Sequence, residues 1–151
     1  MKTEKMSLKI MALPVNESFA RSTVAAFCLR ANPTVEEIGD IKTAVSEAVT
    51  NCIVHAYEYS GGEIDLNVSL NGNELTIIVS DKGRGIKDIA MAMQPFYTTG
   101  NSEERSGMGF TVMEAFTDEL EVTSVPLEGT VVKMKKYLKA ASVENKNART
   151  R

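Results

Sequence analysis

The chain has 151 residues, 43% of them hydrophobic, which predicts a single globular domain with a sizeable core. A net charge of -3 and a pI near 5.3 argue against direct binding to nucleic acid, which normally requires a basic surface. No apolar run approaches the ~20 residues that span a bilayer, and the N-terminus lacks a signal-peptide block. We therefore expect a cytoplasmic protein with no membrane partner.

The first part of the chain predicts one strand followed by two helices. Apolar and polar residues alternate over 6–12, which is typical of a strand. Helical spacing follows over 16–30, and Asn16 is the predicted N-cap. The segment 34–37, Thr-Val-Glu-Glu, has the form of a capping box, and the apolar period behind it predicts a long helix to about residue 58.

Two hairpins, three polar or glycine-rich segments and two short helices are predicted in the remainder. The first hairpin turns at Asn-Gly, which is the strongest local signal of its kind. Polar residues without periodicity predict a mobile loop, and a polar, basic C-terminus predicts a disordered tail. In chain order these are strands 64–70 and 75–79, a glycine-rich segment 81–86, a helix 87–93, a loop 94–107, a helix 110–116, strands around 120–122 and 132–137, and a tail 139–151.

The two cysteines, Cys28 and Cys52, both fall at apolar positions of the predicted helices. Two separated thiols provide neither the spacing of a zinc site nor a disulfide framework. Free cysteine is usually buried and inert. We therefore interpret both residues as part of the core.

A polar stripe interrupts the apolar pattern of the long helix at Glu47, Asn51 and His55. Residues four apart lie on one slowly spiralling helix face, so the three side chains could converge on one ligand. The alternative is the solvated edge of an ordinary amphipathic helix. The stripe alone does not decide between the two interpretations.

Further motifs follow the stripe in a fixed order. They are Asp81-x-Gly83-x-Gly85, a long polar loop, Gly107-Met108-Gly109 opening a helix, and Gly129-Thr130 on a late strand. This order resembles the nucleotide site shared by gyrase, Hsp90 chaperones, histidine kinases and MutL proteins. The resemblance implies an α+β two-layer sandwich over residues 1–138, with helices on one face of a mixed, mostly antiparallel sheet, that binds ATP or ADP with Mg²⁺.

By this resemblance the glycine-rich segment and the late strand hold the adenine. Asp81 would accept a hydrogen bond from the exocyclic amine, and Thr130 would reach the same edge of the base. Gly83 and Gly85 would let the backbone pass close beneath the base, where a Cβ would collide, and Ile86 would supply an apolar wall.

The same resemblance assigns the phosphates to the loop and the helix that follows it. Backbone N–H groups at a helix start and one arginine suit a polyphosphate. The carboxamide oxygen of Asn51 suits Mg²⁺ as a direct ligand, whereas for His55 a structural hydrogen bond is favoured over a phosphate contact. The residues expected at the phosphates are Thr99, Gly100, Arg105, Ser106, Gly107, Met108, Gly109 and Phe110.

A narrower resemblance covers residues 6–137. The segments 16–21, 46–51 and 104–110 closely resemble the anti-sigma factor serine kinases, above all their sporulation members. That family implies a homodimer that phosphorylates a serine of an anti-anti-sigma protein and, when bound to ATP, sequesters a sigma factor of the sigma F type. Glu47 would be the general base and Arg21 a partner contact.

Several alternatives stay open. Glu47 could support Asn51 or position a metal-bound water, and Arg21 could form an exposed salt bridge. The family pattern Thr-Thr-Lys-Pro is replaced by a sequence ending in Gly100-Asn101, so one cationic phosphate contact is expected to be missing. The chain could also be an ATP-gated binding module without kinase activity, a stress-response kinase of the sigma B type, or a detached histidine-kinase catalytic domain.

Overall fold

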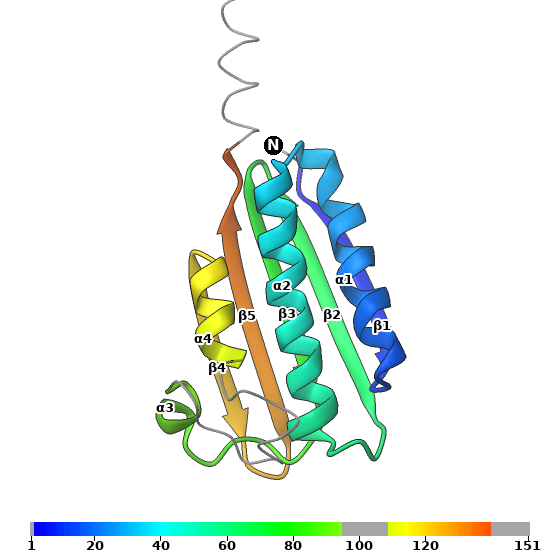
Figure 1. The fold of residues 1–151 in the computed structure, drawn as a ribbon, viewed down its shortest axis with the longest axis vertical. Helices are drawn as coiled ribbons and strands as arrows, with labels where there is room; N and C mark the ends of the chain where they lie inside the picture. Colours follow the sequence, from blue (N-terminus) through cyan, green and yellow to red (C-terminus); the bar gives the residue numbers. More distant parts are fainter. Residues whose placement is uncertain (1, 95–108, 140–151) are drawn as a thin grey trace, which may run out of the picture.

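A computed structural model describes residues 2–94 and 109–139 and shows one sheet covered by helices (Figure 1). The predicted tail and the predicted loop, except Gln94 and Lys139, lie outside the described residues. The elements are β1 (Glu4–Met11), α1 (Val15–Cys28), the 3₁₀ turn η1 (Leu29–Ala31), α2 (Val35–Asn51), the π-helical turn η2 (Cys52–Ala56), β2 (Glu63–Asn71), β3 (Glu74–Asp81), α3 (Ile89–Ala92), α4 (Gly109–Phe116), β4 (Glu119–Val125) and β5 (Gly129–Tyr137).

The sheet has five strands in the order β1-β2-β3-β5-β4. Each of its four pairings is antiparallel, so the mixed sheet of the prediction is antiparallel throughout the described strands. Both predicted hairpins are confirmed, β2 with β3 and β4 with β5. The register places Asp81, the last residue of β3, opposite Thr130 near the start of β5.

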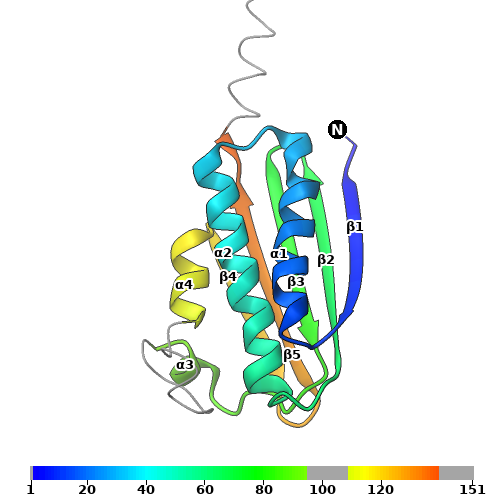
Figure 2. The same ribbon diagram turned by 45° about the vertical axis from the view of Figure 1, so that its right-hand side comes forward.

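The helices α1, α2 and α4 all cover one face of the sheet, which confirms the predicted α+β sandwich (Figures 1 and 2). Inward residues of β2 and β3 alternate with more exposed ones, as period-two patterning requires. No helix in the described part of the chain is long and apolar enough to cross a membrane. The largest fully buried side chains are those of Ile41, Ile64, Leu66, Leu75, Met113, Met134 and Leu138.

The start of α2 has the predicted capping box. The Thr34 hydroxyl accepts from the Glu37 N–H at 3.0 Å, and the Glu37 carboxylate accepts from the Thr34 N–H at 2.9 Å. The predicted cap of α1 is wrong, because Pro14 occupies the N-cap position. Asn16 lies inside the helix, and its side chain donates to the carbonyl of Met11.

The predicted α-helix to about residue 58 is also wrong at its end. The chain leaves α geometry after Asn51 and forms the π-helical turn η2, in which the Tyr57 N–H donates to the carbonyl of Cys52. The carbonyl of Ala56 accepts from the N–H of Arg84, which belongs to the segment after β3. The segment after β3 therefore docks on the wide turn. The apolar periodicity of the helix cannot predict this contact, because Arg84 is distant in sequence.

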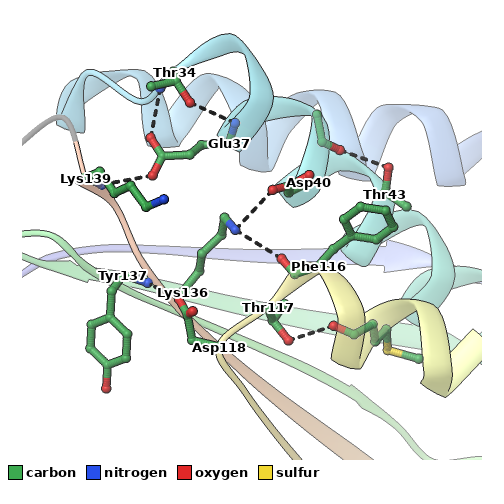
Figure 3. Close-up of polar contacts among 12 residues, drawn as sticks. Thr34, Glu37, Asp40, Thr43, Phe116, Thr117, Asp118, Lys136, Tyr137 and Lys139 are labelled. Atoms are coloured by element: carbon green, nitrogen blue, oxygen red, sulfur yellow. Dashed lines mark hydrogen bonds and ion pairs between the residues drawn. The ribbon is translucent and has the colours of Figure 1, made fainter.

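The opposite end of α2 takes part in a polar cluster with β5 and α4 (Figure 3). The Lys136 ammonium donates to Asp40 of α2 at 3.3 Å and to the carbonyl of Phe116, the last residue of α4, at 3.2 Å. Glu37 accepts the Lys139 N–H at 2.9 Å. We call these residues the distal clamp, namely Thr34, Glu37, Asp40, Phe116, Lys136 and Lys139.

Candidate functional site

A cavity of about 450 Å³ opens at the end of the fold opposite the distal clamp. Its walls come from the end of α2, η2, the segment after β3, α3, the start of α4 and the β4–β5 turn. Such a volume suits a small-molecule ligand. The described residues that line it are Ala48, Asn51, Cys52, His55, Ala56, Asp81, Arg84, Gly85, Ile86, Lys87, Asp88, Ala92, Gly109, Phe110, Pro126, Leu127, Thr130 and Val132.

Asp81 places a carboxylate in this cavity at the end of β3. Its Oδ1 accepts from the N–H groups of Gly83 at 2.9 Å and Thr130 at 3.2 Å, and its Oδ2 accepts from the Cys52 thiol at 3.5 Å. Burial raises the pKa of Asp81, while these three donors act in the opposite direction. The result is a desolvated acceptor that is already oriented.

Thr130 is brought to Asp81 by the pairing of β3 with β5, and only 7% of it is exposed. Its hydroxyl lies 2.8 Å from that of Ser124 on β4. Ser124 in turn accepts from the N–H of Ile86 at 2.8 Å, which fixes the segment after β3 against β4. Three strands therefore position the wall that contains Asp81.

The glycines after Asp81 are required by close contacts of their own segment with the protein backbone. A Cβ at Gly83 would lie 2.4 Å from the carbonyl oxygen of Ala56, so this glycine is required by the packing of its loop against η2. Gly83 does not appear among the described cavity-lining residues. Gly85 does line the cavity, but a Cβ there would meet the Val125 carbonyl at 2.4 Å, and its φ of +72° favours glycine.

The polar stripe is only partly brought into the cavity. Asn51 and His55 line it, and Asn51 Nδ2 and His55 Nδ1 are buried. Glu47 lies one turn before Asn51 in α2 and is not among the described lining residues, although its neighbour Ala48 is. A continuous stripe therefore becomes two cavity residues and a carboxylate beside the cavity.

Arg21 lies on α1, away from the cavity, and is held by Glu17. The guanidinium of Arg21 is 2.9 Å from a Glu17 carboxylate oxygen, which also accepts a hydrogen bond from the Ser46 hydroxyl of α2. Ser46 directly precedes Glu47 in the chain. The predicted partner contact and the predicted base thus lie on two helices joined by one carboxylate.

The predicted phosphate residues fall mostly outside the described part of the chain, namely Thr99, Gly100, Arg105, Ser106, Gly107 and Met108. Gly109 and Phe110, at the start of α4, do line the cavity. The cavity also brings together Ile86 and Asp81, as the sequence predicted.

Three contributing residues were not predicted from the sequence. Cys52 is buried as expected, but its thiol also donates to the Asp81 carboxylate. The Tyr57 hydroxyl accepts from the Lys82 N–H at 2.7 Å and donates to Glu63, so it fixes the loop after β3. Ser124 could have been found as a polar residue among the alternating positions of its strand.

Comparison with known proteins assigns the class of this fold and site. Residues 10–136 match the histidine kinase-like ATPase domain family, and a domain of this class binds nucleotide. The fold is similar to a crystal structure of the RsbU and RsbW domains of Rv1364c from Mycobacterium tuberculosis. The TM-score is 0.64 at 19% identity, over 89% of this chain and 32% of that one.

Curated relatives narrow the class. The chain is 57% identical to the anti-sigma F factor of Thermoanaerobacter pseudethanolicus over 90% of its length and 95% of the relative. It is 58% identical to that of Caldanaerobacter subterraneus, over 88% and 93%, and 54% identical to that of Clostridium acetobutylicum, over 87% and 92%. The chain belongs to the anti-sigma F factor family.

Proposed function

We propose that this protein is an ATP-dependent serine kinase that also acts as an anti-sigma factor in sporulation. One observation carries the proposal: a single cavity joins the half-buried acceptor Asp81 to the carboxamide of Asn51. These two groups suit opposite ends of an adenine nucleotide, since one accepts from the base and the other offers an oxygen near the phosphates. The curated relatives are named anti-sigma F factors, which supports a sigma factor of that type as the partner.

The chemistry of the lining residues fits ATP with Mg²⁺. Asp81 and Thr130 would hold the adenine edge, and Gly109 at the start of α4 would present its backbone to phosphate. Asn51 would hold Mg²⁺ through one hard oxygen, the ion's other ligands being water and phosphate oxygens. Bound Mg²⁺ would neutralise charge on the transferred phosphoryl group.

Glu47 is the proposed general base for a serine hydroxyl of the anti-anti-sigma substrate. It precedes Asn51 by one helical turn, so in the proposed complex its carboxylate would lie near the phosphates that Asn51 and Mg²⁺ would hold. Arg21, held by Glu17, is the proposed contact for both protein partners. The active form is proposed to be a homodimer.

A second candidate function is an ATP-gated sigma-binding module without kinase activity. It is favoured by the position of Glu47, which is not among the described residues that line the cavity. Both candidates need Asp81 and Asn51. They differ in whether the carboxylate of Glu47 takes up a proton from a substrate.

The decisive experiment incubates the purified protein with radiolabelled ATP and candidate anti-anti-sigma proteins. Glu47→Gln should abolish label transfer, with nucleotide affinity and sigma binding largely retained. Glu36→Gln, an exposed glutamate in the first turn of the same helix, is the matched control and should transfer label normally. Retained transfer in Glu47→Gln would remove the base assignment, and no transfer by the unmodified protein would favour the binding module.

The acid stability of the product identifies the acceptor. Phosphoserine survives acid, whereas phosphohistidine does not. An acid-stable label on the antagonist supports the serine kinase, and an acid-labile one would indicate a detached histidine-kinase domain instead. A pull-down in the presence of ATP can compare sigma factors of the F type and the B type. Binding of the F type supports the sporulation assignment, and binding of the B type would favour the stress-response assignment.

A further inference from the structure

The two oxygens of the Asp81 carboxylate have different partners. Oδ1 accepts two backbone N–H groups, from Gly83 and Thr130. Oδ2 accepts the Cys52 thiol at 3.5 Å. The two backbone donors are fixed by the fold. Of these three donors, the Cys52 thiol is therefore the one that a side-chain substitution can remove.

Cys52 is placed for this contact by η2, of which it is the first residue. It is 3% exposed and lines the cavity beside Asp81. An ordinary cysteine thiol carries its proton at neutral pH, and the Cys52 sulfur lies within hydrogen-bonding distance of the carboxylate, so it can donate to Asp81.

We infer that Cys52 is a positioning residue that sets base selectivity: its S–H donates to Asp81 Oδ2 and keeps the carboxylate an oriented, ionised acceptor. The inference rests on the proposed nucleotide site. An ionised carboxylate accepts from the exocyclic amine of adenine but repels the carbonyl oxygen that guanine has at that position. A protonated carboxyl group could instead donate to that oxygen. Loss of the thiol donor favours protonation of Asp81, so it would reduce the preference for adenine over guanine.

The test measures the dissociation constants of ADP and GDP by calorimetry. Cys52→Val keeps the apolar bulk and removes the donor, and should weaken ADP binding roughly three- to tenfold, as expected for one lost hydrogen bond. GDP binding should stay the same or improve, so the dissociation constant of GDP divided by that of ADP should fall. Cys52→Ser restores a donor and should return this ratio most of the way to that of the unmodified protein.

The other buried cysteine supplies the control. Cys28 lies in α1 and is fully buried, so Cys28→Val makes the same change in the core without a contact to Asp81. It should leave both affinities unchanged. An equal change in Cys28→Val, or an unchanged ratio in Cys52→Val, would overturn the inference while leaving nucleotide binding in place. Absence of ADP binding by the unmodified protein would instead remove the nucleotide site itself.

A spectroscopic measurement does not depend on whether Cys52→Val folds. The S–H stretching band of Cys52, isolated in the infrared spectrum of Cys28→Val, should report a hydrogen-bonded thiol and should shift when ADP is added. A purely structural cysteine would not respond to the nucleotide. A band that is unchanged by ADP at saturation would therefore also overturn the inference.

Discussion

The two ends of the molecule each contain a carboxylate that accepts two backbone N–H groups, buried Glu37 at one end and half-buried Asp81 at the other, yet the pKa values of the two are shifted in opposite directions. At the distal clamp, burial would raise the pKa of Glu37, but the Thr34 and Lys139 hydrogen bonds and the nearby Lys136 ammonium lower it overall. At the cavity, burial of Asp81 prevails over its donors and raises its pKa. The comparison shows that a similar pair of backbone donors does not fix the direction of a pKa shift: the nearby Lys136 ammonium helps to lower that of Glu37, and Asp81 has no such cation among the causes of its shift.

The largest expected effect is at the cavity end. Asp81→Asn removes the ionised acceptor and should weaken ADP binding by roughly 1.5–3 kcal/mol, or about 10- to 150-fold, the range for a hydrogen bond to a charged group. Calorimetric titration measures it. A change below twofold would show that Asp81 is not the base contact.

The same variant should not unfold more easily. Because the pKa of Asp81 is raised in the folded state, its ionised form opposes folding, so Asp81→Asn should be as stable as the unmodified protein or more stable at neutral pH. The difference should shrink as the pH falls through the raised pKa, where the native carboxyl group is protonated. Urea unfolding of the two proteins over that pH range tests the sign.

The opposite result is expected at the distal clamp. Glu37→Ala removes half of the capping box and leaves the Lys139 N–H without its acceptor, so the free energy of unfolding should fall by about 2 kcal/mol. ADP affinity should not change. Glu36→Ala in the same turn is the exposed control, and an equal loss there would contradict a specific role for Glu37.

This stabilisation should also depend on pH with the opposite sign to that of Asp81. Hydrogen bonds from Thr34 and Lys139 hold the folded-state pKa of Glu37 below the ordinary value of a glutamate side chain, despite its burial. Its contribution is therefore present above that value and is lost as the pH falls through the folded pKa. The difference in unfolding free energy between Glu37→Ala and the unmodified protein should accordingly narrow as the pH falls below the ordinary glutamate value and through the lowered folded-state pKa.

The smallest expected effects compare one substitution at both ends. Gly83→Ala forces a Cβ to within 2.4 Å of the Ala56 carbonyl oxygen and should destabilise the protein by about 1–3 kcal/mol. Gly39→Ala, near the start of α2 with no atom within 4 Å of the added Cβ, should stabilise it by roughly 0.5–1 kcal/mol. Thermal unfolding measures both, and equal shifts of the same sign would contradict the difference in packing.

Local patterns were sufficient to predict most of the fold. The alternation of Ile64 to Leu70 and the Asn71-Gly72 turn predicted the first hairpin, and Thr34 with Glu37 predicted the start of α2. These signals depend on residues close in sequence, so one chain was enough to find them. The proximity of Asp81 and Thr130 was expected from the family resemblance that the order of the glycine motifs carries, and the register of β3 with β5 shows it.

Features created by contact between distant segments were not predictable in this way. The carbonyl of Ala56, in the π-helical turn, accepts from the N–H of Arg84, a residue far away in the sequence. The close approach of Gly83 to the Ala56 carbonyl joins segments that are distant in sequence, so local patterns did not indicate it. The contact of Cys52 with Asp81 joins the end of a predicted helix to the end of a predicted strand, and neither pattern indicates that the two residues meet.

The π-helical turn also has a consequence for the length of the chain. A turn closed between Cys52 and Tyr57 holds one residue more than an α-helical turn. Removal of one residue from this stretch would allow α-helix to continue, but it would rotate Ala56 away from the loop that docks on it. Natural or designed variants of this segment are therefore constrained in the number of residues as well as in their identity.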